Sequence, residues 1–247
     1  MQTIIKQNKH ELGKLAARMG ADYIRTALEL RGESNIILAT GVSQFEVLEA
    51  LIDELGIDWS RVTCFHLDEY VGMTASHPAS FRKFLKERFV DLLPTPLAAF
   101  HYLNVEKDPE GECERVSAII SQHPIDVAFI GIGENGHIAF NDPPANFTTD
   151  EPYILVPLDD ACRRQQLGEG WFSTFEDVPT HAVSMSVKQI LKSRAIICTV
   201  PDERKAAAAR NTIEHSVSPD FPSTILRTHA DVTLLLDGAS ASLLSSK

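Results

Sequence analysis

The chain has 247 residues, of which 44% are hydrophobic and 23% charged, and its formal net charge is −11 at pH 7. This length suits one large α/β domain, and the composition supports a substantial buried core. The excess of acidic side chains disfavours nucleic acid and anionic membrane surfaces as partners. The first 18 residues lack the apolar region of a signal peptide, and no apolar run approaches the ~20 residues that span a bilayer, so we expect a cytoplasmic protein.

Apolar runs alternate with stretches of helical period along the chain. Helices are expected at 9–30, near 45–55, at 81–89, 110–121 and 203–215, the second with an apolar face of Phe45, Leu48, Leu51, Ile52 and Leu55. Strands are expected at 35–39, 61–67, 125–132, 194–200 and 232–236, and the run at 125–132 is the most apolar and therefore central. The pattern predicts one α/β domain over 1–247 with a doubly wound, mostly parallel sheet, helices on both faces, and ligands at loops after strand ends.

Four cysteines are scattered without a Cys-x-x-Cys pair: Cys64, Cys113, Cys162 and Cys198. In a chain of this length, such spacing is typical of reduced, mostly buried thiols of an intracellular protein. No flanking sequence supports a catalytic cysteine.

The first strand exit contains Thr40, Gly41, Val42 and Ser43. A glycine and hydroxyl groups at a helix N-terminus offer free N–H groups and a favourable dipole to a phosphate. Ser43 and Glu46 also match a capping box, and taken alone the loop favours capping over phosphate binding.

Two adjacent carboxylates, Asp68 and Glu69, follow the second strand. A buried charge must be paired or functional, so one of these groups is a candidate general base. A helix cap or a surface salt bridge is the structural alternative.

The most informative segment runs from 131 to 144 and reads GIGENGHIAFNDPP. Its glycines permit a tight turn and close backbone approach to a ligand. Asp142 lies five residues after His137, and a carboxylate that orients a histidine stabilises its charged form. Residues 131–136 also match the dinucleotide fingerprint, but Asn141 and two prolines interrupt any helix, and Glu151 does not end a strand, so we disfavour dinucleotide binding.

A further strand exit carries Asp202, Arg204 and Lys205. We expect Asp202 to cap the following alanine-rich helix and to place both cations in its first turn. Cations there oppose the helix dipole, whereas an anion shared by the lysine and the helix N-terminus would reverse that effect. This arrangement indicates a phosphate site in an otherwise acidic protein.

In this order, LDEYVGM at 67–73, HPASF at 77–81, GIGENGHIAFND at 131–142, the lysine helix and PSTILRTH at 222–229 resemble the glucosamine-6-phosphate deaminase family. The resemblance reaches across most of the chain, and 6-phosphogluconolactonases share the fold more loosely. Its implied mechanism uses neither a metal nor an organic cofactor. His137 would assist ring opening, Asp68 would move the proton at C2, and ammonia would leave to give a fructose phosphate.

The resemblance also assigns further roles. Asn135 and Asp142 would complete the catalytic set with Asp68 and His137. The substrate, a sugar phosphate, would be held by Thr40, Gly41, Ser43, Glu69, Arg164 and Lys205.

Four departures from the family pattern put the preferred sugar in doubt. Asn135 stands where some members have an acid, although asparagine is also seen there. Asp142 stands where members often carry glutamate, which reaches one methylene further toward His137. Val42 replaces the second glycine of the phosphate loop, and the register of the arginine segment 162–166 leaves Arg164 as a choice among neighbours.

Two alternatives to a deaminase of glucosamine 6-phosphate or galactosamine 6-phosphate remain open: a 6-phosphogluconolactonase-type hydrolase and a non-catalytic sugar-phosphate sensor. The sequence also leaves the oligomeric state open, a homo-oligomer included.

Overall fold

A computed structural model describes residues 1–245. The helices are α1 (Lys9–Arg31), α2 (Phe45–Ile52), α3 (Phe81–Arg88), α4 (Pro109–Ile120), α5 (Asp160–Gly168), α6 (Val187–Leu191) and α7 (Ala206–Glu214). The strands are β1 (Gln2–Lys6), β2 (Ser34–Leu38), β3 (Val62–His66), β4 (Asp68–Tyr70), β5 (Ala99–His101), β6 (Val127–Ile130), β7 (Tyr153–Pro157), β8 (His181–Met185), β9 (Ala195–Val200) and β10 (Val232–Asp237). Short 3-10 turns precede two helices: η1 (Val42–Gln44) before α2 and η4 (Glu203–Lys205) before α7.

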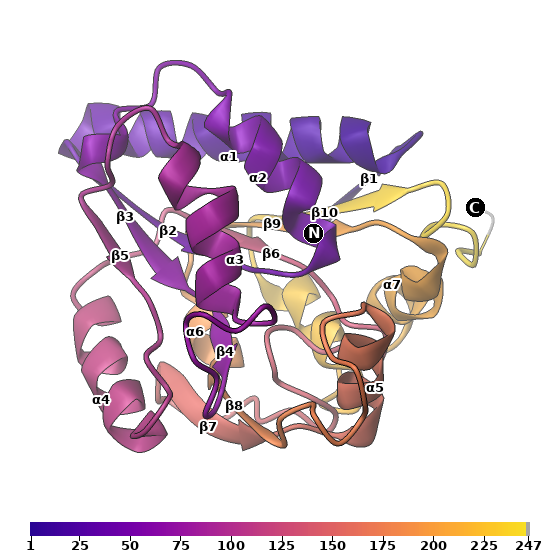
Figure 1. The fold of residues 1–247 in the computed structure, drawn as a ribbon. Coiled ribbons are helices and arrows are strands. Elements are labelled where there is room, and N and C mark those ends of the chain that lie inside the picture. The colour runs from indigo at the N-terminus through magenta and orange to yellow at the C-terminus, as the bar shows by residue number, and fades with distance from the viewer. Residues whose placement is uncertain (246–247) are drawn as a thin grey trace.

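The main sheet has seven strands in the order β1-β10-β9-β6-β2-β3-β5, and all of its pairings are parallel (Figure 1). The doubly wound, mostly parallel sheet predicted from the sequence is therefore confirmed. β6 lies in the middle of the order, as its apolar composition predicts, because a strand covered on both faces has no solvated side.

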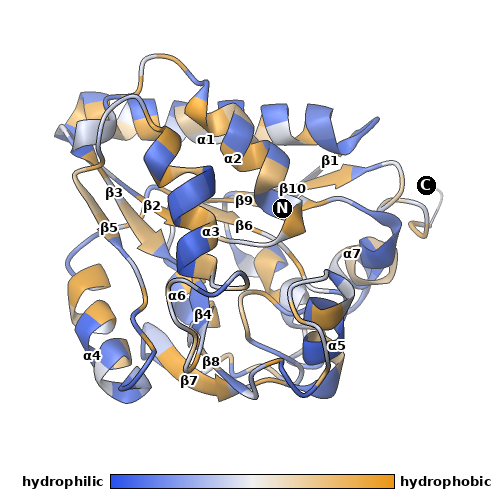
Figure 2. Cartoon of the chain, in the orientation of Figure 1, coloured by the Kyte–Doolittle hydropathy of each residue, from blue (hydrophilic) through white to orange (hydrophobic). Residues whose placement is uncertain are grey.

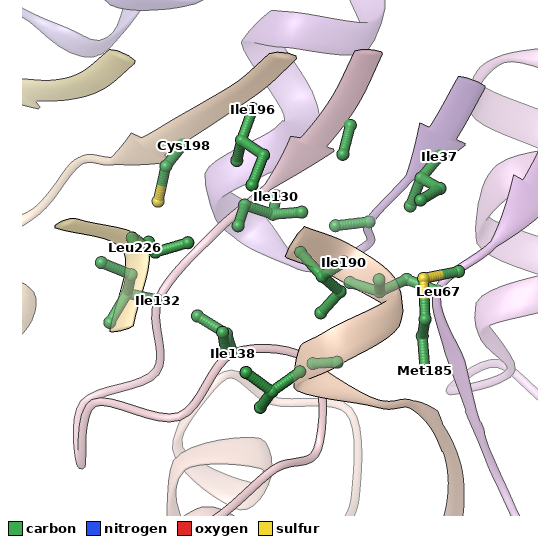
Figure 3. Close-up of a cluster of buried hydrophobic side chains, with 14 of the residues drawn as sticks. Ile37, Leu67, Ile130, Ile132, Ile138, Met185, Ile190, Ile196, Cys198 and Leu226 are labelled. Carbon is green, nitrogen blue, oxygen red and sulfur yellow. The ribbon is translucent and has the colours of Figure 1, made fainter. Parts of the chain in front are cut away.

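Side-chain alternation along the strands of the main sheet builds two of the three buried hydrophobic clusters of the described residues. In β6, Val127 and Phe129 pack with α1, α2 and α3 on one face, whereas Ala128 and Ile130 pack with α4, α6 and α7 on the other. Figure 2 shows the helices with apolar residues on the sides that cover the sheet and polar residues outside. Figure 3 shows the second core, in which Ile130 of β6, Ile196 of β9 and Ile190 of α6 come together.

A second, antiparallel sheet lies beside the first, with the order β4-β8-β7. The sequence did not predict it. β4 follows β3 after the single residue Leu67, and its Asp68 lies opposite Ser184 of β8. The chain thus leaves the main sheet directly before Asp68, which positions this carboxylate at a junction of the two sheets.

Most expected elements are present, with some corrections at their ends. α1 begins after Asn8, whose side chain accepts a hydrogen bond from the Glu11 N–H, and ends at Gly32 in the left-handed conformation. α2 ends at Ile52, so Leu55 is 86% exposed and the expectation that it belongs to the apolar face is wrong. Strands β1 and β5 at the sheet edges were not predicted.

The sequence predicted reduced, mostly buried cysteines and no segment able to span a membrane. All four cysteines are free, and Cys113 alone among them is not fully buried. No helix within residues 1–245 combines the length and the apolar character needed to cross a bilayer.

Close packing of α1 on β6 gives a first prediction. A Cβ atom on Gly20 would lie 2.0 Å from the ring of Phe129, which is 1% exposed and has no space to retreat. We expect Gly20→Ala to lower the free energy of unfolding by about 1–3 kcal/mol, measured by denaturant titration. Gly168→Ala, at the end of α5 with nothing within 4 Å of the added atom, is the control and should leave stability nearly unchanged. Equal stability of both variants would contradict the close approach of α1 to the sheet.

Candidate active site

Loops at the C-terminal ends of the parallel strands form one pocket, the place where ligands gather in this class of sheet. β2, β3, β6 and β9 each contribute the residues that follow them, and α5 covers the opening. The lining residues are Ala39, Thr40, Gly41, Val42, Ser43, Leu67, Asp68, Phe81, Gly131, Ile132, Gly133, His137, Ala139, Phe140, Gln165, Gln166, Glu169 and Lys205.

The loop after β2 turns sharply at Gly41, whose φ of 89° favours glycine. The capping box expected from Ser43 and Glu46 is wrong, because neither η1 nor α2 receives a side-chain cap. Instead, the buried Gln44 amide donates hydrogen bonds to Thr199 Oγ1 (2.8 Å) and Ile130 O (3.2 Å). The loop is thereby tied to β9 and β6, and the uncapped start of the turn faces the pocket.

Asp68 lines the pocket and is 6% exposed, yet its carboxylate accepts no hydrogen bond from any residue in 1–245. Burial, and secondarily the charge of Glu69, raises the pKa of Asp68 to about 8. A carboxylate that is desolvated and unpartnered is a stronger base than an ordinary aspartate. The carboxylate pair of the sequence therefore contains one group suited to accept a proton from a ligand.

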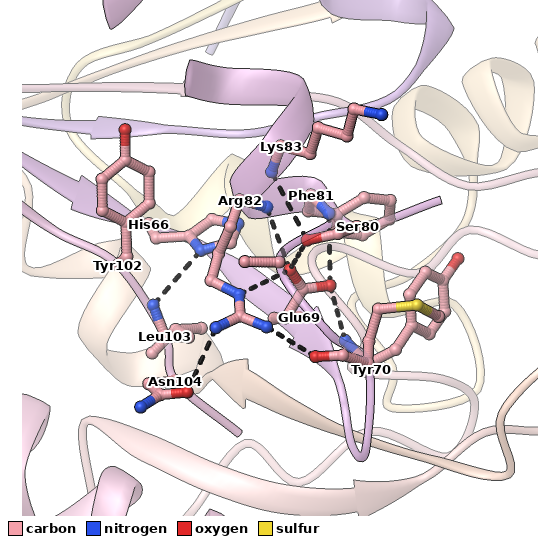
Figure 4. Close-up of polar contacts among 12 residues, drawn as sticks. His66, Glu69, Tyr70, Ser80, Phe81, Arg82, Lys83, Tyr102, Leu103 and Asn104 are labelled. Carbon is pink, nitrogen blue, oxygen red and sulfur yellow. Dashed lines mark hydrogen bonds and ion pairs between the residues drawn. The ribbon is translucent and has the colours of Figure 1, made fainter. Parts of the chain in front are cut away.

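Glu69 lies outside the pocket, contrary to the expectation that it binds substrate. It is fully buried, and its oxygens accept hydrogen bonds from Ser80 Oγ (2.8 Å) and from the N–H groups of Tyr70, Phe81 and Arg82 (Figure 4). The Arg82 Nε lies 3.4 Å from Glu69 Oε2. Burial raises the pKa of Glu69 against the opposing effect of these hydrogen bonds. Its contacts make it a cap and ion-pair partner for α3.

His137 is delivered to the pocket by the glycine-rich exit of β6. A Cβ atom on Gly133 would lie 2.3 Å from the His137 ring, so only glycine permits this close return of the chain. The ring Nδ1 lies 3.0 Å from Asp142 Oδ1. The aspartate thus reaches the histidine without the additional methylene of a glutamate.

Asp142 is fixed from two further directions. Asn135 Nδ2 donates to Asp142 Oδ1 (2.9 Å), and the Asp159 N–H donates to Oδ2 (3.1 Å). Burial acts to raise the pKa of the Asp142 carboxyl, but His137, Asn135 and the Asp159 N–H together lower it below its ordinary value. Asn135 also accepts a hydrogen bond from the His137 N–H (3.0 Å), so its place is behind the histidine rather than in the pocket.

Lys205 is the cation of the pocket. It is 4% exposed, and its ammonium group makes no ion pair or hydrogen bond within residues 1–245. Burial lowers the pKa of Lys205, and the nearby carboxylates of Glu169 and Glu134 oppose that shift. The preceding Asp202 caps η4 rather than α7 and adopts a φ of 86°, a strained conformation for a residue with a side chain. The strain lies where the chain turns from β9 to place Lys205.

The α5 side chains over the pocket were missed by the sequence analysis. Gln165 Oε1 accepts a hydrogen bond from the Glu134 N–H (2.8 Å), and its amide donates to Glu169 Oε1 (2.9 Å). Glu169 Oε2 lies 4.0 Å from the Cβ position of Gly41. A carboxylate therefore stands beside the loop and the lysine that are expected to hold an anion.

Arg164 is placed away from the pocket, and its assignment as a phosphate ligand is wrong in this structure. It is exposed on α5, and its guanidinium lies 4.9 Å from the centre of the Phe175 ring. Helical geometry turns Arg164 outward while Gln165 and Gln166 face the pocket. No arginine of the described chain lines that pocket.

The dinucleotide alternative also fails on local structure. The residues after β6 form turns through Gly136 and continue without a helix to β7. The helix N-terminus that such a fingerprint requires does not follow these glycines.

Comparisons with known proteins agree with this geometry. Residues 7–235 match the sequence model of the family described as glucosamine-6-phosphate isomerases/6-phosphogluconolactonase. A glucosamine-6-phosphate deaminase of Streptococcus pneumoniae is 35% identical over 244 residues, which cover 99% of each chain. The solved structure of a monomeric glucosamine-6-phosphate deaminase superposes with a TM-score of 0.89 at 30% identity, covering 98% of this chain and all of that one. A 6-phosphogluconolactonase of Thermotoga maritima shares the fold, with a TM-score of 0.78 at 15% identity and coverage of 96% and 99%.

The contacts of Asp142 give a second prediction. Its side chain is 7% exposed, and both oxygens are already engaged, so Asp142→Glu must push a methylene into occupied space. We expect a loss of about 1–3 kcal/mol in the free energy of unfolding, measured by denaturant titration. Asp160→Glu, at a side chain that is 71% exposed in the first turn of α5, is the matched control and should change little. Unchanged or increased stability of Asp142→Glu would show that the site accommodates the longer acid.

Proposed function

Because the chain belongs to the family of glucosamine-6-phosphate isomerases and 6-phosphogluconolactonases, we propose that it is an amino-sugar-phosphate deaminase and isomerase. It converts glucosamine 6-phosphate and water into fructose 6-phosphate and ammonia, with galactosamine 6-phosphate as the second candidate substrate. The observation that carries the proposal is the unpartnered carboxylate of Asp68, which shares a pocket with His137 and Lys205.

The phosphate group binds at the Lys205 end of the pocket. The buried ammonium makes no ion pair within residues 1–245, and the loop of Thr40, Gly41 and Ser43 presents an uncapped helix start beside it. A charge-assisted hydrogen bond from a buried lysine is stronger than one in water. This end of the pocket therefore fixes the substrate and directs its sugar ring toward Asp68 and His137.

His137 opens the ring. It donates a proton to the ring oxygen and takes up the proton of the C1 hydroxyl, which gives the open-chain aldehyde and restores the imidazole. Asp142, held by Asn135 and by the Asp159 N–H, stabilises the charged imidazole and sets its orientation. The histidine is thus suited to exchange protons with the sugar oxygens.

Asp68 then moves the proton of C2. It removes this proton to give an enolamine between C1 and C2, and it then delivers a proton to C1 to give an imine at C2. Water adds to the imine, and ammonia leaves to form the ketone. A base with a raised pKa suits the abstraction of a carbon-bound proton at neutral pH.

A lactonase would use the same phosphate site for hydrolysis and would not need a base at C2. Full-length identity of 35% to deaminases, against 14–19% to solved lactonases, favours deamination. The direct test incubates the protein with glucosamine 6-phosphate or with 6-phosphogluconolactone and measures ammonia and acid release. Acid release from the lactone without ammonia from the amino sugar would replace this proposal, and binding of sugar phosphate without turnover would favour a sensor.

The role of Asp68 gives a third prediction. Asp68→Asn is expected to lower kcat by on the order of 10²–10⁴ while sugar-phosphate affinity changes little. In the wild type, kcat/KM should rise with pH toward a plateau above about 8, since the base acts when deprotonated. Asp53→Asn, exposed at the end of α2, is the control. Persistent exchange of the C2 proton with solvent in Asp68→Asn would contradict the assignment.

The pH dependence of the free energy of unfolding tests the raised pKa of Asp68 independently of catalysis. The pKa of Asp68 is raised on folding from 3.8 to about 8, so the folded state binds the proton more tightly than the unfolded state between these values. Its contribution to stability is therefore present at low pH and lost as pH rises, by at most ~1.4 kcal/mol per pH unit. Asp68→Asn removes this loss and should be more stable than the wild type at pH 8.

The phosphate end of the pocket gives a fourth prediction. Lys205→Met keeps the apolar stem and removes the charge, and KM for the sugar phosphate should rise roughly tenfold or more. Arg204→Met is the matched control, because this neighbouring cation is 43% exposed and already paired with Asp202. Glu169→Gln removes the carboxylate beside the site and should shift KM in the opposite direction. If Lys205→Met alters only stability, the phosphate binds elsewhere.

A further inference from the structure

His137, Asp142 and Cys162 bring three different metal-binding groups together, and of these residues His137 lines the pocket. One imidazole nitrogen, one carboxylate oxygen and one sulfur lie within 4.8 Å of one another. Cys162 is 1% exposed and His137 is 8% exposed, so the group is enclosed by protein. The proposed reaction uses the histidine and the aspartate but gives the cysteine no task.

The His137 Nδ1 atom has no aligned hydrogen-bond partner within residues 1–245, although Asp142 Oδ1 is only 3.0 Å away. It is a buried ring nitrogen beside the carboxylate, and it can bind a cation in place of the proton that it would share with Asp142. A metal ion is one of the few ligands that engages an imidazole nitrogen and a carboxylate oxygen at once.

We propose that the His137, Asp142 and Cys162 side chains form an inhibitory site for a borderline divalent cation, with Zn²⁺ as the best fit. Thiolate, imidazole and carboxylate together are a typical ligand set for zinc, whereas Mg²⁺ and Ca²⁺ take oxygen ligands. Tetrahedral coordination at normal bond lengths places ligand atoms about 3.4–3.6 Å apart. The three ligand atoms lie within 4.8 Å of one another, so side-chain rotation brings them to this spacing.

Asp159 holds two of the three ligands in place. Its N–H donates to Asp142 Oδ2 (3.1 Å), and its own carboxylate accepts a hydrogen bond from the Cys162 N–H (2.6 Å) at the start of α5. Asn135 Nδ2 fixes Asp142 Oδ1 from the other side. Outer contacts of this kind orient ligands and raise metal affinity.

The ion enters through the pocket, which His137 lines. On binding, the Cys162 S–H bond breaks, the sulfur lone pair forms the bond to the metal, and the proton leaves to solvent. Three protein ligands leave a fourth position for water. The ion separates His137 from Asp142, so, given the proposed role of His137, ring opening stops while the Lys205 end of the pocket stays free.

Binding is tested directly with Co²⁺ as a spectroscopic probe and with Zn²⁺ by calorimetry. We expect a thiolate-to-cobalt absorption band in the wild type, and a Zn²⁺ affinity that falls roughly tenfold or more in Cys162→Ala. Cys113→Ala, on α4 and away from the pocket, is the matched control and should bind as the wild type does. These measurements need only the folded chain, so they succeed or fail independently of the proposed reaction.

Inhibition is tested with the same variants. Without added metal, Cys162→Ala should retain wild-type activity, and Zn²⁺ should lower kcat of the wild type and of Cys113→Ala reversibly on EDTA addition. Cys162→Ala should be resistant. Equal binding and equal inhibition of the three proteins would place the metal elsewhere and overturn the proposal. If Cys162→Ala is unstable, Cys162→Ser replaces it. A cobalt–thiolate band that persists in Cys162→Ser would also place the metal elsewhere and overturn the proposal.

Discussion

Two adjacent carboxylates are buried where the chain passes from the large sheet to the small one, and the site depends on how each is accommodated. Neighbouring residues of a strand point to opposite sides, so Asp68 and Glu69 cannot share partners. Glu69 receives four hydrogen bonds and the Arg82 ion pair, which attach β4 to the start of α3. With Glu69 engaged by these partners, the opposite side of the strand holds Asp68 in the pocket without a hydrogen-bond partner in residues 1–245. Glu69 attaches β4 to α3, and Asp68 is the proposed base.

The neighbouring cations Arg204 and Lys205 also differ in whether their charge is paired. A net charge of −11 repels a phosphate at long range, so binding requires a short-range cation in a desolvated place. Arg204 is paired with Asp202, whereas its neighbour Lys205 is buried and unpaired in the described chain. Asp202 adopts a strained backbone conformation at this turn. Glu169 lines the same pocket, and its carboxylate opposes the lowering of the Lys205 pKa by burial.

Much of the fold was predictable, because the spacing of apolar residues within a long helix or strand identifies that element without its tertiary partners. The alternation of apolar strands and helices predicted the parallel sheet, and the composition of 125–132 predicted its centre. The elements that were missed are those with weak local patterns. β7 reads YILVP, with no polar residue to reveal which side is buried, and β4 is three residues long. Their pairing depends on residues at least 24 positions away, such as Val183, which lies opposite both Leu155 and Glu69.

The sequence predicted the site residues that lie in loops directly after parallel strands. It did not predict which way the side chains next to them point. Thr40, Gly41, Ser43, Asp68, His137 and Lys205 reach the pocket because parallel strands end at one edge of the sheet. Glu69 and Arg164 stand next to pocket residues in the sequence, but strand alternation turns the first inward and helical periodicity turns the second outward. Ser43 matched a capping box, yet the buried Gln44 amide anchors the loop before a regular helix begins. Adjacent positions in a motif therefore share a location but not a function, and only the tertiary partners of each side chain separate the base from the cap.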